Sequence, residues 1–112
     1  MRSALLCSGL SLLLLGAAPV SAQESLPVPA YPDFMEVCLS SVTTPNSDGG
    51  AFAMAGVLCH CTYEQVADRA VMTKTEFTGA MRSCGQAAQR DPEGFMSTYV
   101  PRVQEAIRKN PR

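Results

Sequence analysis

Four cysteines constrain this chain more than any other feature of its sequence. Cys59 and Cys61 flank His60, and Cys38 and Cys84 lie at nearly equal distances on either side of that pair. An even set of cysteines with such spacing, in a small exported chain, is typical of a disulfide framework. The spacing therefore predicts two disulfides that hold three consecutive segments together.

The start of the chain indicates where those disulfides would form. Arg2 supplies a positive charge, an apolar stretch runs from Leu10 to Ala18, and Val20-Ser21-Ala22 offers a small-residue cleavage site. These are the parts of a secretory signal peptide, so we expect residues 1–22 to be removed and the mature protein to be secreted or periplasmic. Cys7 would leave with the signal, which makes the remaining number of cysteines even.

The remaining sequence carries no membrane or nucleic-acid signature. Its longest apolar run, Ala51 to Cys59, is well short of the roughly 20 residues that a transmembrane helix needs. Once Arg2 is removed with the signal, ten acidic and eight basic side chains nearly cancel, which leaves no electrostatic footprint for nucleic acid. We expect neither a membrane span nor a nucleic-acid partner.

The pattern after residue 22 predicts an all-α domain. Residues 23–32 contain three prolines and should form an extended leader, and residues 33–112 should form one domain. Helical spacing of apolar residues follows over 34–42, then a loop dense in turn formers over Thr43 to Gly50, then a central helix from Ala51 to about Ala70 that includes Phe52 in its apolar sector. No segment shows the alternation of a strand.

Two helix starts are marked by their capping residues. Thr73 and Glu76 fit a capping box ahead of a third helix, and Asp91-Pro92 provides an N-cap and a first-turn proline for a fourth. Pro101 should kink or divide that fourth helix. The predicted fold is a small three- to four-helix bundle with two disulfides.

Helical geometry also bears on which cysteines pair. Residues two apart on a helix point about 200° away from each other, so Cys59 and Cys61 should reach different neighbours. Antiparallel packing favours Cys38–Cys59 with Cys61–Cys84. The crossed pairing, Cys38–Cys61 with Cys59–Cys84, changes the heights of the paired residues along the helix axes by only about 3 Å. It therefore stays open. Each disulfide should contribute about 3 kcal/mol, so we expect reduction to unfold the domain.

The same residues allow two other kinds of chemistry. Cys59, His60 and Cys61 could chelate a soft metal such as Cu(I) together with methionine thioethers, or the two cysteines could exchange electrons as a thiol pair. His60 is the only histidine, and neither a clustered methionine motif nor a thioredoxin-like βαβ pattern accompanies it. The disulfide framework is therefore favoured, with no metal or cofactor and with His60 as a solvent-facing spacer.

Catalytic patterns are also missing from the sequence. It contains no nucleophile elbow, no phosphate-binding glycine loop and no His-Glu-x-x-His motif. Glu64 and Asp68 lie at i and i+4 and could form a carboxylate pair, although a solvated helix face is the simpler interpretation. We do not expect an enzyme.

The arrangement Phe34-x-x-x-Cys38, then Cys59-x-Cys61, then Thr75-Glu76-Phe77 at a helix boundary resembles small exported bacterial proteins of uncharacterised function. The resemblance covers roughly residues 34–84. It implies a periplasmic, disulfide-linked helical domain and carries no catalytic residues.

Two functional hypotheses follow from the sequence. The preferred one is a non-catalytic binding module for another envelope protein, such as an inhibitor, an immunity partner or a chaperone, that presents the Thr43–Gly50 loop or a Phe95–Tyr99 patch. Core packing of Phe95, Met96 and Tyr99 is the simpler interpretation of that patch. The alternative is thiol-redox or Cu(I) handling by Cys59 and Cys61.

Overall fold

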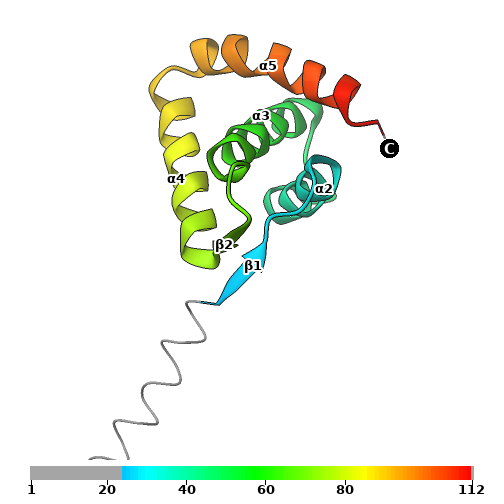
Figure 1. The fold of residues 1–112 in the computed structure, drawn as a ribbon. Helices are drawn as coiled ribbons and strands as arrows, with labels where there is room; N and C mark the ends of the chain where they lie inside the picture. The colour runs from blue at the N-terminus through cyan, green and yellow to red at the C-terminus, as the bar shows by residue number, and fades with distance from the viewer. Residues whose placement is uncertain (1–23, 112) are drawn as a thin grey trace, which may run out of the picture.

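The computed structural model describes residues 24–111, so the predicted signal peptide lies outside the described residues. Four helices account for most of the described chain, and two three-residue strands accompany them (Figure 1). The elements are β1 Ser25–Pro27, α2 Tyr31–Val42, α3 Gly49–Val66, β2 Val71–Thr73, α4 Lys74–Arg90 and α5 Pro92–Lys109. The predicted all-α class with two disulfides is confirmed. None of the described helices combines the length and apolarity required to cross a membrane.

Helix α3 is the centre of the fold. It packs against α2, α4 and α5, which surround it in Figure 1. Its sequence is apolar on nearly every face, as expected of a helix with neighbours on several sides. Seven of its residues are buried: Ala55, Val57, Cys59, His60, Cys61, Thr62 and Val66. Phe52, which we expected in the core, is instead 48 % exposed.

The core consists of two clusters, and each contains one disulfide. The first joins α2, α3 and α4 around Cys38–Cys59, with Phe34, Val66 and Ala80 buried beside it. The second joins α3, α4 and α5 around Cys61–Cys84, with buried Val57, Ala88 and Phe95. Cys59 and Cys61 thus anchor opposite sides of the central helix, as their angular separation predicted.

Both predicted helix starts are present. The Thr73 hydroxyl accepts from the Glu76 N–H at 3.1 Å, and the Glu76 carboxylate accepts from the Thr73 N–H at 2.8 Å. Asp91 caps α5 through the Gly94 N–H, and Pro92 occupies the first turn. Pro101 does not divide the helix: α5 continues past it to Lys109. The proline removes one backbone hydrogen bond, but flanking turns are retained on both sides.

Three boundaries differ from the sequence-based predictions. β1 and β2 pair antiparallel, with Leu26 opposite Met72, although no strand was expected. Part of the predicted leader therefore belongs to this sheet, and α2 already begins at Tyr31. Helix α3 ends at Val66 rather than near Ala70, because the chain turns there and Ala70 accepts a hydrogen bond from Val28. At its other end α3 includes Gly49 and Gly50 and is capped by Asp48.

Candidate functional site

The cysteines form the pairing that helix geometry favoured. Cys38 bonds to Cys59 and Cys61 bonds to Cys84, rather than in the crossed arrangement. All four side chains are at most 3 % exposed. Thiol exchange and soft-metal binding both require an accessible thiolate, and in this form none of these sulfurs is a thiolate. The arrangement fits structural disulfides in an oxidising environment.

A glutamine covers the second disulfide. The Gln65 side-chain amide donates toward Cys84 Sγ at 3.3 Å and lies 3.9 Å from Cys61 Sγ. Thiol attack on a disulfide needs access to one sulfur along the S–S axis. Burial and this amide both restrict that access at Cys61–Cys84.

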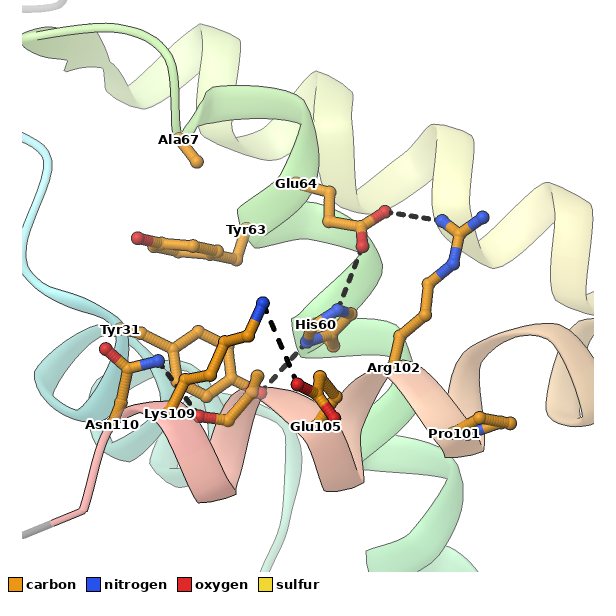
Figure 2. Close-up of a pocket in the computed structure, with 11 residues that line it drawn as sticks. Tyr31, His60, Tyr63, Glu64, Ala67, Pro101, Arg102, Glu105, Lys109 and Asn110 are labelled. Atoms are coloured by element: carbon orange, nitrogen blue, oxygen red, sulfur yellow. Dashed lines mark hydrogen bonds and ion pairs between the residues drawn. The ribbon is translucent and has the colours of Figure 1, made fainter.

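His60, which we expected to face solvent, is buried and hydrogen-bonded on both sides. Its ring is 5 % exposed, its Nδ1 lies 2.9 Å from the Tyr31 hydroxyl and its Nε2 lies 3.0 Å from Glu64 Oε2. Glu64 Oε1 in turn accepts from Arg102 Nη1 at 2.9 Å. Figure 2 shows His60 between the tyrosine and the glutamate, with Arg102 reaching the same carboxylate. We call these four residues the Tyr31–His60–Glu64–Arg102 chain.

The Tyr31–His60–Glu64–Arg102 chain has one consistent proton arrangement when Glu64 is ionised and His60 is neutral. The carboxylate can only accept, so Nε2 carries the proton and donates to Glu64, while Nδ1 accepts from the Tyr31 hydroxyl. Burial, with the neighbouring Tyr63 and Glu64, raises the pKa of Tyr31, which keeps the hydroxyl protonated as this role requires. Both nitrogens of His60 are therefore occupied in holding α2, α3 and α5 together.

A depression of about 710 Å³ lies over this chain. Its charged groups are already paired: Arg102 with Glu64, and Lys109 with Glu105 at 3.7 Å. Throughout residues 24–111, every buried side-chain nitrogen or oxygen has a hydrogen-bond partner. Glu64 and Asp68 are both exposed, as the solvated-face interpretation predicted, but the Glu64 carboxylate also bonds to His60 and Arg102, which the sequence did not indicate. The hydroxyl beside His60 in this depression is that of Tyr31.

An apolar groove lies on the other side of the C-terminal half of α5. It occupies about 530 Å³ and is lined by α2, α3 and α5, with residues Met35, Leu39, Phe52, Gly56, Val103 and Ile107 among its walls. We call it the α2–α5 groove. α2 and α5 both pack on α3 but scarcely touch each other, so their facing sides remain open. Phe52 and Ile107 are 48 % and 59 % exposed there.

The protein was also compared with known proteins. No family model, curated protein or solved structure matches it.

The two surfaces suggested by the sequence differ from the groove. Asp48 and Ser47 tie down the Thr43–Gly50 segment, because Asp48 caps α3 and Ser47 bonds to Thr44. In the Phe95–Tyr99 segment, Phe95 is buried and Met96 and Tyr99 pack against the second core cluster, which supports the core interpretation. The exposure of Phe52 and Ile107 could not be predicted from the sequence, because each belongs to an apolar helix stripe of the kind that usually packs into a core.

Proposed function

We propose that this protein is a secreted or periplasmic, non-catalytic binding module, and that its α2–α5 groove takes an amphipathic helix of another envelope protein. The observation that carries the proposal is the groove itself, an open apolar surface between two helices that share α3 as a floor. A helix laid between α2 and α5 would occupy a position that the bundle leaves empty, as in other helix-in-groove complexes.

The floor and walls of the groove suit a helix. Nothing lies within 4 Å of the position that a Cβ on Gly56 would take, so a side chain of an incoming helix has room to approach the α3 backbone. Met35 and Leu39 on one wall are flexible or branched apolar side chains that can adjust to a partner. Exposed Phe52 and Ile107 provide aromatic and aliphatic contacts of the kind that dominate binding energy.

The rest of the molecule supports a scaffold role. Two buried disulfides fix α2, α3 and α4 relative to one another, and the Tyr31–His60–Glu64–Arg102 chain links α2 and α5 through α3. A groove whose walls are fixed in advance costs less ordering free energy on binding. The disulfides also pair all four cysteines of the described residues, which favours a scaffold over thiol chemistry.

The test compares two variants with equally exposed apolar side chains. Ile107→Asp changes the groove, while Val37→Asp changes α2 outside the groove, and the two side chains are 59 % and 63 % exposed. Tagged mature protein is purified from the envelope fraction, and any associated protein is re-bound to the purified variants by titration. We expect Ile107→Asp to weaken binding by about tenfold or more and Val37→Asp to leave it unchanged.

Circular dichroism and intact mass without reduction establish that both variants fold with two disulfides. Equal binding by both folded variants would contradict the proposal, and so would a partner lost only in Val37→Asp.

A further inference from the structure

A second apolar pocket lies between the β1–β2 sheet, α2 and the first turns of α4, at the lower end of the molecule in Figure 1. Its volume is about 230 Å³, and it shares no lining residue with the α2–α5 groove. All of its lining is apolar except Thr73 and Lys74. We call it the sheet pocket.

The sheet pocket has a buried floor and an exposed rim. Phe34 and Cys38 on the floor are buried, and Met72 is half-buried against the same core cluster. On the rim, Leu26 and Val37 are 54 % and 63 % exposed. An apolar cavity of about 150 Å³ is enough to bind benzene from water. A ligand with an apolar body would therefore find a dry floor here and would cover both exposed side chains.

Lys74 is the only charged residue that lines the sheet pocket. Within residues 24–111 its ammonium group forms no ion pair, not even with Glu24, which lies opposite it in the register of the strands. The nearby Glu76 pairs with Arg69 and does not line the pocket. Thr73 already uses its hydroxyl and its N–H in the cap of α4. An uncharged pocket with one free cation at its edge suits an apolar ligand that carries one negative charge.

We infer that the sheet pocket binds a small monocarboxylic acid with an apolar tail, whose carboxylate pairs with Lys74 while its tail lies over Phe34 and Met72. The volume limits the ligand, because about 230 Å³ is less than the roughly 300–1,000 Å³ of pockets for drug-sized molecules. It holds about eight carbon atoms if each takes the roughly 30 Å³ of a water molecule. This inference goes beyond the proposed function and does not depend on it, because the groove and the sheet pocket are separate.

Titration of the mature protein with octanoate tests the inference. Isotope-labelled methionine methyl groups report the site by NMR, because Met72 lines the sheet pocket and Met35 lines the α2–α5 groove. We expect octanoate to shift the Met72 signal and to leave the Met35 signal in place. Butanoate should bind about tenfold or more weakly, since each buried methylene changes affinity about fourfold. Octylammonium, with the same chain and the opposite charge, should bind more weakly than octanoate.

Two pairs of variants test the charge and the rim. Lys74→Met should weaken octanoate binding about two- to fivefold, whereas Arg82→Met, which removes an exposed cation of α4 outside the pocket, should not. Val37→Asp places a negative charge on the rim and should also weaken binding, whereas Ile107→Asp in the groove should leave it unchanged. Circular dichroism and unreduced intact mass confirm that each variant folds.

The outcomes are distinct from those of the groove experiment. No shift of the Met72 signal at about 10 mM octanoate, equal affinity for octanoate and octylammonium, or equal losses in Lys74→Met and Arg82→Met would overturn the inference. A shift seen with vesicles of anionic phospholipid but not with free octanoate would overturn it too, because the ligand would then be a membrane surface. In each of these cases the proposed function stands or falls by helix binding to the groove alone.

Discussion

The two halves of α5 meet the rest of the protein in different ways. Before Pro101 the helix contributes Phe95, Met96, Tyr99 and Val100 to the second core cluster, and after Pro101 Val103 also packs against that cluster. After Pro101 no residue up to Lys109 is buried, and an open surface lies on each side of the helix. One helix thus serves first as core and then as the wall of a groove. Because the packing stops partway along the helix, apolar side chains such as Ile107 remain exposed.

The largest expected effect comes from truncating each half in turn. Phe95→Ala removes a buried aromatic side chain and should cost about 3–5 kcal/mol of unfolding free energy. Ile107→Ala truncates a side chain that is 59 % exposed, and should change stability by no more than about 0.5 kcal/mol. Urea denaturation followed by circular dichroism gives both values. Similar losses would show that the two halves are packed alike.

The disulfide beneath the first half of α5 should come next. Replacing Cys61 and Cys84 together by alanine opens a loop with a sequence separation of 23 residues, and should lower the unfolding free energy by about 3 kcal/mol. Replacing Cys38 and Cys59 together should have a similar effect, because the loops are nearly equal. Thermal unfolding of the two double variants provides the measurement. A variant that keeps the full stability would show that its disulfide is not part of the scaffold.

The Tyr31 hydroxyl links α2 to His60, and its loss should have an intermediate effect. Tyr31→Phe leaves the buried Nδ1 of His60 without a donor and should cost about 1–3 kcal/mol near neutral pH. The raised pKa of Tyr31 means that the folded state holds its proton more tightly than the unfolded state. Stability from this group is therefore full below pH 10 and declines as pH rises above it.

Brief urea titrations above pH 10 should thus show a steeper decline for the wild type than for Tyr31→Phe. The same slope in both proteins would remove Tyr31 from this role.

The sequence predicted the parts of the fold that depend on neighbouring residues. The Thr73 and Asp91 caps are hydrogen bonds between residues close in sequence. The cysteine pairing follows from the heights of the cysteines along neighbouring antiparallel helices. His60 could not be placed in this way, because its partner Tyr31 and the more distant Arg102 come from other helices. The strand pairing of β1 with β2 also escaped prediction, since three-residue strands leave no visible alternation.

The groove was unpredictable for a related reason. Apolar spacing reveals which face of a helix is apolar, but it does not reveal whether a neighbour covers that face. Helix α5 has the same kind of stripe on both sides of Pro101, and only packing in three dimensions distinguishes buried Phe95 from exposed Ile107.

The smallest expected effect concerns the ion pair that fastens the second half of α5. Arg102 and Glu64 are both partly exposed, so Arg102→Met should cost only about 0.2–1 kcal/mol in global stability. Its local effect should be clearer. Amide hydrogen exchange should accelerate from Arg102 to Lys109 and change little from Phe95 to Val100, where only the Tyr99 ring contacts the Arg102 guanidinium. Uniform acceleration along α5 would contradict this division of the helix.

The central claim is that the open half of α5 and the facing side of α2 form one protein-binding surface. The most direct measurement is amide hydrogen exchange on the full mature protein, with and without the associated protein purified from the envelope fraction. We predict slower exchange in α2 and in residues 101–110, with no change in β1, β2 or α4. Protection confined to the β1–β2 end, or the absence of any protection at a saturating concentration of that protein, would contradict the claim.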